Sequence, residues 1–125
     1  MNELAKLHCS PVKDNTPQLN EREISQLKSK LPDWSIYEKE GEPRLEKIFK
    51  FKDFNQAVAF TDKVAQEADK EDHHPAILTE WGKVTVTWWT HKIKGLHQND
   101  FIMAAKTDQL FGGTSENSQF LFTPR

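Results

Sequence analysis

The stretch "AILTEWGKVTVTWWTH", residues 76–91, decides the fold because it predicts a β-hairpin. β-branched and aromatic residues on both sides of Gly82-Lys83 indicate two strands joined by a tight turn. Side chains along a strand alternate between its two faces. One face of the second strand therefore carries Val84, Val86 and Trp88, and the other carries Thr85, Thr87, Trp89 and His91. The first face suits a hydrophobic core. The second face carries side chains such as Trp89 and His91 that are too large and too polar for an ordinary solvent-exposed surface, which suggests a groove or a subunit contact.

Three helices and a second hairpin complete the pattern. A capping box of Asn20 and Glu23 predicts a helix that stops at Pro32. The stretch "WSIYEKEGEPRLEKIFKFKD", residues 34–53, predicts two strands around a Gly-Glu-Pro turn. Further helices are expected over residues 54–70 and 96–111. The expected apolar contacts are Phe54, Val58, Thr61, Val64 or Ala65 and Ala68 in the second helix, with Ala57 at the edge of that stripe, and Phe101, Ile102, Ala105 and Leu110 in the third.

The element order α-β-β-α-β-β-α predicts an α+β fold: a four-stranded antiparallel sheet with three helices packed on one face. Residues 44–53 are a candidate edge strand, whose lysines would disfavour non-specific pairing with strands of other molecules. Phe60 lies off the predicted stripe of the second helix, where a partner surface would bury it. We therefore expect at least a symmetric homodimer, with the sheets continuing across the two-fold axis.

Length and composition indicate one soluble domain over residues 20–111, between a flexible polar leader (1–19) and a flexible tail (112–125). The net charge of −2, with no basic cluster, argues against a nucleic-acid partner. No apolar run suits a membrane span or a secretory signal, and the single cysteine, Cys9, forms no internal disulfide. The cytoplasm is the expected location. His8-Cys9 lacks the further cysteine that a structural zinc site would use.

Three histidines are the candidate functional residues. His73 and His74 precede Pro75, which biases the residue before it toward an extended conformation, so both imidazoles belong at a helix-to-strand junction. In the predicted hairpin, residues near position 74 lie roughly opposite His91. Each histidine alone reads as an ordinary surface residue, but three that converge beside a tryptophan predict a functional site.

The spacing of these residues resembles the pterin-4a-carbinolamine dehydratase family. The resemblance rests on Asp69, His73-His74-Pro75, Trp81, His91 and Asp100 at the spacings of that family's pattern. The segments "LPDWSIYE", "IFKFKDFNQAVAF" and "THKIKGL" are also similar to family sequences, and the similarity covers residues 20–111. His97 departs from the pattern, because many members have a Ser or Thr-like cap there, and histidine is a poorer cap.

The resemblance implies a role for each matching residue. His73, His74 and His91 correspond to the catalytic histidines, and Asp100 to an acidic residue that supports them. Pro75, Thr90, Lys92 and Ile93 fall where the family contacts the pterin, and Trp34 matches a tryptophan of the active site. His74 is expected to be the principal acid–base group, because its neighbour Pro75 should make it the more rigid.

The implied reaction removes water from a 4a-hydroxytetrahydropterin, the product of an aromatic amino acid hydroxylase, and yields the quinonoid dihydropterin. The hydroxyl needs a proton to leave as water, and a ring nitrogen must lose one. Histidine suits both roles near neutral pH. No redox change occurs, so we expect neither a metal nor an organic cofactor. The family also implies dimers or tetramers.

Two other functions compete with this one. Some family members act as dimerisation cofactors of a transcription factor, so a non-enzymatic interaction protein of the same fold is the main alternative. A metal hydrolase built on the three histidines is disfavoured, because no Asp or Glu lies at a spacing such as His-Glu-x-x-His.

Overall fold

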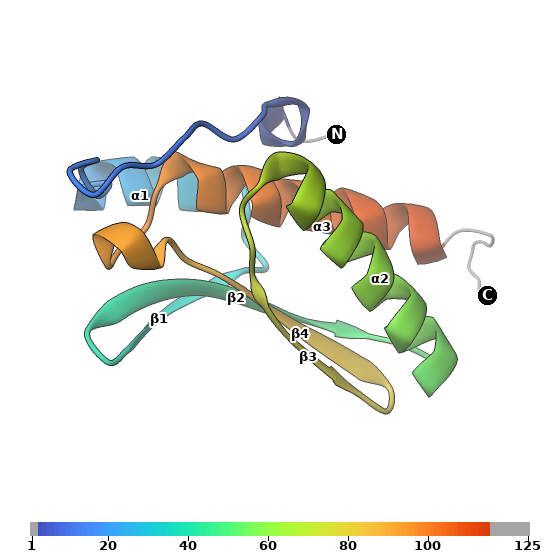
Figure 1. Cartoon of the computed structure of the whole chain (residues 1–125). Coiled ribbons are helices and arrows are strands. Elements are labelled where there is room, and N and C mark those ends of the chain that lie inside the picture. The colour runs from blue at the N-terminus through green and yellow to red at the C-terminus, as the bar shows by residue number, and fades with distance from the viewer. Residues whose placement is uncertain (1–2, 116–125) are drawn as a thin grey trace.

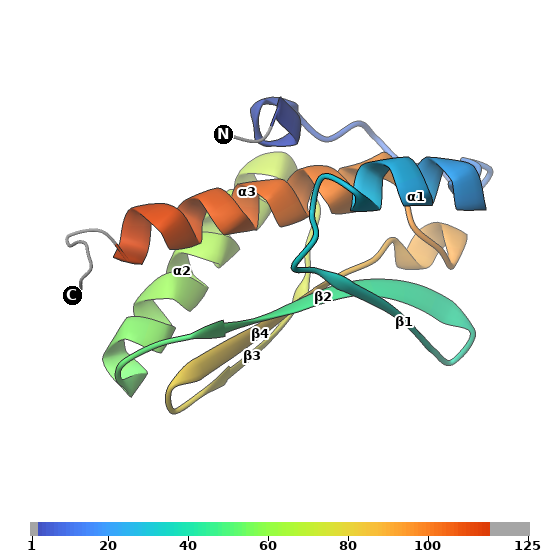
Figure 2. The same ribbon diagram turned by 180° about the vertical axis from the view of Figure 1, so that it is seen from behind.

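The computed structural model describes residues 3–115, in which four strands form one antiparallel sheet with the order β1-β2-β4-β3. Figure 1 shows α1, α2 and α3 on the same face of this sheet, as the sequence predicts, and Figure 2 shows the arrangement from behind. The strands are β1 (Ser35–Lys39), β2 (Glu42–Lys50), β3 (Ala76–Glu80) and β4 (Lys83–Trp88). The helices are α1 (Glu21–Lys28), α2 (Phe54–Glu71) and α3 (Gln98–Ser115), with 3-10 turns η1 (Glu3–Lys6) and η2 (His91–Ile93).

The local signals in the sequence explain how the elements begin. The Asn20 side chain accepts a hydrogen bond from the Glu23 N–H, and the Glu23 side chain accepts one from the Asn20 N–H, which completes the predicted capping box of α1. The Asp53 carboxylate accepts from the Gln56 N–H at 2.8 Å and caps α2 in the same way.

Both hairpin turns lie slightly before their predicted positions. The first turn is Glu40-Gly41, whose φ angles of 54° and 78° are the pair of positive values that a type I′ turn requires. Glu42 and Pro43, which we expected in the turn, are the first residues of β2. In the second hairpin Glu80 pairs with Lys83, so the turn is Trp81-Gly82 and not Gly82-Lys83.

The core lies between the sheet and the helices. Val84, Val86 and Trp88 are completely buried, which confirms the predicted inner face of β4. The predicted stripe of α2 is confirmed at Val64 and Ala68 and at its edge residue Ala57, but it is wrong at Phe54 and Val58. The buried residues of that helix are Ala57, Phe60, Val64 and Ala68, whereas Phe54 and Val58 are 48% and 37% exposed. Phe60 is therefore a core residue, packed between Phe49, Phe51 and Phe111, and not a sign of a partner surface.

The edge of the sheet also differs from the prediction. β2, which we took as a candidate edge strand, pairs with β1 on one side and with β4 on the other. The edges are β1 and β3, and β3 carries the exposed Leu78. On the face of the sheet away from the helices, Tyr37 and Ile48 are also exposed.

Residues 3–12, part of the expected flexible leader, contact the domain at several points. Leu4 and Ala5 of η1 are buried, and the Lys106 ammonium of α3 donates to the Ala5 carbonyl at 2.9 Å. At the end of the expected leader, the Leu19 N–H donates to the Leu96 carbonyl. At the other end α3 continues to Ser115, beyond the predicted end of the helix at residue 111. The rest of the predicted tail, including "FLFTPR", lies outside the described residues.

Candidate active site

The two adjacent histidines lie where α2 gives way to β3. Asp72 ends α2 in the left-handed conformation, with φ 55°, and the His73 N–H donates to the Ala68 carbonyl. This reversal turns the chain across the end of the helix before β3 begins at Ala76. The predicted helix-to-strand junction is thus present.

His91 reaches the same region from the other side, but not from a strand. β4 ends at Trp88, Thr90 forms an isolated bridge with Gly95, and His91 opens the 3-10 turn η2. The predicted strand therefore stops earlier than expected. The bridge folds the chain into a short loop that holds His91 beside the end of the sheet.

The three histidines line one cavity of about 530 Å³. This volume lies within the usual range for small-molecule sites, roughly 300–1,000 Å³. Of the other residues assigned to the substrate, Thr90 and Lys92 line the cavity and Pro75 and Ile93 do not. The remaining lining residues are Cys9, Ser10, Pro11, Val12, Glu71, Asp72, Trp89 and Asn99.

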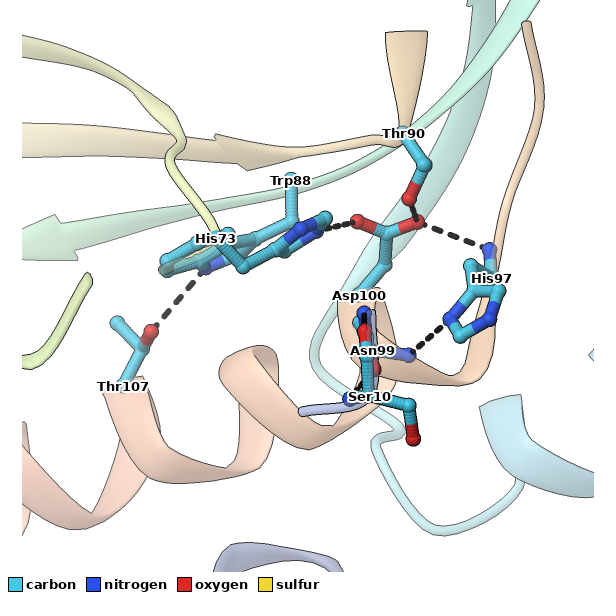
Figure 3. A network of polar contacts seen from close by, with 8 residues as sticks. All are labelled: Ser10, His73, Trp88, Thr90, His97, Asn99, Asp100 and Thr107. Carbon is cyan, nitrogen blue, oxygen red and sulfur yellow. Dashed lines mark hydrogen bonds and ion pairs between the residues drawn. The ribbon is translucent and has the colours of Figure 1, made fainter. Parts of the chain in front are cut away.

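His73 is the most rigidly held of the three. Its side chain is only 11% exposed, and its ring stacks on Trp88 with centroids 5.9 Å apart and an interplanar angle of 9°. The Trp88 indole N–H in turn donates to the Thr107 hydroxyl of α3. His73 Nε2 lies 2.6 Å from Oδ1 of Asp100, which is completely buried (Figure 3).

The Asp100 carboxylate is the centre of a hydrogen-bond network (Figure 3). It joins the segment after α2, the segment after β4 and the start of α3. Oδ2 of Asp100 accepts from the Thr90 hydroxyl at 2.8 Å and from the His97 N–H at 2.9 Å. The His97 ring completes the start of α3, because its Nδ1 accepts from the Asn99 N–H at 3.0 Å. Histidine thus caps this helix despite its poor average propensity. Burial lowers the pKa of His97, which favours the neutral ring that can accept this bond.

The contact with Asp100 bears on which nitrogen of His73 is available. When Asp100 is ionised its carboxylate can only accept hydrogen bonds, and the proton of a neutral His73 ring then lies on Nε2. In the neutral ring the other nitrogen, Nδ1, is then unprotonated and can take up or return a proton. A buried carboxylate that orients an imidazole in this way is a common element of general acid–base sites.

His74 and His91 are held more loosely. His74 is 56% exposed and lies 2.9 Å from the exposed Asp69, and His91 is 78% exposed and lies 3.2 Å from the largely buried Glu42. His73, and not His74 as expected from its neighbour Pro75, is the more buried and the more extensively contacted of the two adjacent histidines.

Trp34 lies away from this cavity. It is 1% exposed, packs edge-on against Phe49 in the core, and donates its indole N–H to the Asp108 carboxylate at 3.1 Å. Trp89 is the tryptophan that lines the cavity, and the Arg44 guanidinium lies 4.0 Å from the centre of its ring. The alternation of β4 had already placed Trp89 on the face expected to carry a groove.

The N-terminal contribution to the cavity was missed. Residues Cys9 to Val12 form part of the lining, although their polar composition is typical of a flexible leader. No local signal in the sequence could have placed them there, because their partners are 62 to 89 residues away along the chain. Within residues 3–115 no group of three His, Cys, Asp or Glu side chains is arranged to hold a metal ion.

Comparisons with known proteins identify the family of the chain. A sequence model described as "Pterin 4 alpha carbinolamine dehydratase" matches residues 17–110. The chain is 55% identical over 111 residues to a Microcystis aeruginosa protein named "Putative pterin-4-alpha-carbinolamine dehydratase". The alignment covers 89% of this chain and 96% of the relative.

Two solved structures share the fold. A transcriptional coactivator/pterin dehydratase from Brucella melitensis aligns with a TM-score of 0.69 and 33% identity, over 77% of this chain and all of the other. A pterin dehydratase-like protein described as a RuBisCO assembly factor of the alpha-carboxysome aligns with a TM-score of 0.55 and 27% identity, over 64% of this chain and 90% of the other. From the family match, which spans most of the chain, and from the 55% identical relative, the chain belongs to the pterin 4 alpha carbinolamine dehydratase family.

Proposed function

We propose that this protein converts a 4a-hydroxytetrahydropterin into the quinonoid dihydropterin and water by histidine acid–base catalysis. The observation that carries the proposal is the buried His73–Asp100 pair, on a cavity that His74 and His91 also line, in a chain of this family. The cavity has room for a bicyclic pterin. The reaction would serve to recycle the tetrahydropterin used by an aromatic amino acid hydroxylase.

His73 is the best-placed group for the central proton transfer. The reaction breaks the bond between C4a and the hydroxyl oxygen, which takes up one proton and leaves as water, while a ring nitrogen gives up one proton. His73 can act through Nδ1 because Asp100 holds its Nε2 proton, and Asp100 also stabilises the imidazolium that forms. His74 and His91 then transfer the second proton of the reaction or contact the hydroxyl group. A positioned acid–base group contributes roughly 10²–10⁴-fold to a rate.

The cavity also offers groups that could bind the pterin. Lys92 and Trp89 line it, and the Arg44 guanidinium over the indole helps to fix the position of Trp89. Trp89 therefore replaces Trp34 in the proposal as the aromatic surface for the flat ring. Thr90 has a supporting role, because its hydroxyl donates to Asp100.

Turnover of the carbinolamine tests the proposal. The unstable substrate is generated in place by a pterin-dependent hydroxylase, and its decay is followed by stopped-flow absorbance with and without the protein. A concentration-dependent acceleration is expected. A decay rate that does not change when the protein is added would contradict the proposal.

Assembly and location form a second part of the proposal. Among residues 3–115, β1 and β3 are the edge strands of the sheet and pair with no further strand, and an exposed edge is a site that proteins tend to pair or cover. Together with the exposed Leu78, these edges favour a homodimer or homotetramer in which a sheet edge pairs with its copy. No helix in the described part of the chain is long and apolar enough to cross a membrane. A cytoplasmic location remains the expectation.

The alternative is a non-enzymatic interaction protein with the same fold. The solved structure described as a RuBisCO assembly factor is one relative to which such a role is attributed. On this chain the exposed Tyr37, Ile48 and Leu78 would suit such contacts. The complete set of three histidines with a buried Asp100 favours the enzyme. Turnover without any captured partner would support the enzyme, and binding of a partner without turnover would support the alternative.

A further inference from the structure

The N-terminal segment, residues 3–12, is bound along the domain and is here called the strap. It lies outside residues 17–110, which the family model matches. Figure 1 shows η1 against α3 on the side away from the sheet, and the chain then runs along the helices toward α1. The first anchor is apolar: Leu4 and Ala5 are 3% and 7% exposed.

A buried carboxylate provides the second anchor. Glu71, at the end of α2, is 5% exposed in its side chain. Its Oε1 accepts from the Cys9 N–H at 2.8 Å, its Oε2 lies 2.7 Å from His8 Nδ1, and the Lys106 ammonium is 3.8 Å away. Burial raises the pKa of Glu71, but the hydrogen bonds from Cys9 and His8 and the charge of Lys106 outweigh it and lower the pKa overall. The anchor is therefore charged at neutral pH.

A third anchor lies closer to the histidines. The Asn99 side chain accepts from the Ser10 N–H at 2.9 Å and donates to the Ser10 carbonyl at 2.8 Å, so it pairs with the strap as a neighbouring strand would (Figure 3). Asn99 is 2% exposed. The Lys92 ammonium donates to the Val12 carbonyl at 3.3 Å.

These anchors bring Cys9, Ser10, Pro11 and Val12 to the cavity that contains the three histidines. We propose that the strap forms one wall of the pterin site and strengthens substrate binding without transferring protons, an inference that rests on the proposed pterin function. The strap offers Pro11 and Val12 as apolar surface. Burial, with the nearby negative charges of Glu71 and Asp100, raises the pKa of the Cys9 thiol to about 12, so the thiol stays protonated near neutral pH.

Two substitutions outside the cavity test the inference as a matched pair. Leu4→Asp places a charge at a buried position of η1 and should release the strap, whereas Leu7→Asp places the same charge at a position that is 43% exposed. Neither residue lines the cavity. The dissociation constant of a stable dihydropterin is measured by quenching of tryptophan fluorescence. Alkylation of Cys9, the only cysteine in the sequence, is followed by mass spectrometry.

We expect Leu4→Asp to weaken dihydropterin binding about tenfold, the change that corresponds to losing one or two ordinary hydrogen bonds or apolar contacts. It should also accelerate Cys9 alkylation, and Leu7→Asp should match the wild type in both measurements. In the wild type, saturating dihydropterin should slow the alkylation of Cys9. In turnover, KM should rise while kcat stays the same, as expected for loss of uniform binding.

Faster alkylation in Leu4→Asp with an unchanged dissociation constant would overturn the inference. Deletion of residues 1–12 removes the wall whatever holds it, and wild-type binding by that variant would also overturn it. A fall in kcat at constant KM would give the strap a role in the chemistry and contradict its assignment as a wall. A wild-type protein that binds dihydropterin but does not accelerate dehydration would refute the proposed function, while the binding data would still decide the role of the strap. A wild-type protein that does not bind dihydropterin would overturn both.

Discussion

Asp100→Asn is the substitution that probes the site most specifically. The two side chains have nearly the same shape, so the change removes a charge and replaces one acceptor oxygen by an NH₂ group. The remaining oxygen can still accept from Thr90 and His97, as Oδ2 does in the wild type. The NH₂ group then faces His73 Nε2 and must donate to it. The proton of His73 would move to Nδ1, which is the nitrogen that the proposal needs for catalysis.

The expected magnitudes follow from these contacts. Exchange of a hydrogen bond to a buried charge for a neutral hydrogen bond should lower the free energy of unfolding by about 1 kcal/mol. Turnover should fall by roughly 10²–10⁴-fold, because the acid–base group would be in the wrong tautomer. Urea unfolding measures the first effect and stopped-flow dehydration the second. The nitrogen chemical shifts of His73 report its tautomer directly.

Asp108→Asn is the matched control on the same helix. Asp108 accepts from the Trp34 indole N–H and from the Lys47 ammonium, and it does not line the cavity. Its side chain is 33% exposed, so the variant should lose only about 1 kcal/mol or less and keep its turnover. If Asp100→Asn dehydrated the substrate as fast as this control, or kept the wild-type tautomer of His73, the role given to Asp100 would be wrong.

Three further outcomes are expected. Extensive dialysis against a chelator should leave dehydratase activity unchanged, and activity that zinc alone restores would instead support the metal hydrolase. Because the pKa of Glu71 is lowered in the folded protein, its ionised form stabilises the fold above the ordinary glutamate pKa, and this contribution is lost as the pH falls through the lower folded value. The difference in unfolding free energy between the wild type and Glu71→Gln should therefore be largest near neutral pH and should shrink in acid; a constant difference would contradict the anchor. Light scattering at micromolar concentration should give at least twice the chain mass of 14.5 kDa, and the mass of one chain would exclude the proposed assembly.

The features that the sequence predicted correctly depend on neighbours along the chain. The capping box of Asn20 and Glu23, the alternation of Val84, Val86 and Trp88, and the junction before Pro75 are all local patterns, and the structure contains each of them. The order of elements followed from these patterns, and the antiparallel sheet followed from the two hairpins.

The features that the sequence did not predict depend on distant contacts. Helix α2 has two apolar rows one residue apart, and only packing against Phe49 and Phe111 selects the row that contains Phe60. The rigidity of His73 comes from Trp88 and from Asp100, which lie 15 and 27 residues away along the chain. The strap is held by Glu71 and Asn99, so its polar composition gave no local sign that it would be ordered.

The central claim is that the His73-centred cavity dehydrates the carbinolamine, and the initial rate of carbinolamine decay with His73→Ala tests it most directly. The wild type should accelerate the decay in proportion to its concentration. His73→Ala should keep the fold at lower stability, because buried Asp100 loses a partner, should bind a stable dihydropterin, and should lose roughly 10²–10⁴-fold of the catalysed rate, more than either His74→Ala or His91→Ala. A His73→Ala protein that keeps the wild-type rate would contradict the account.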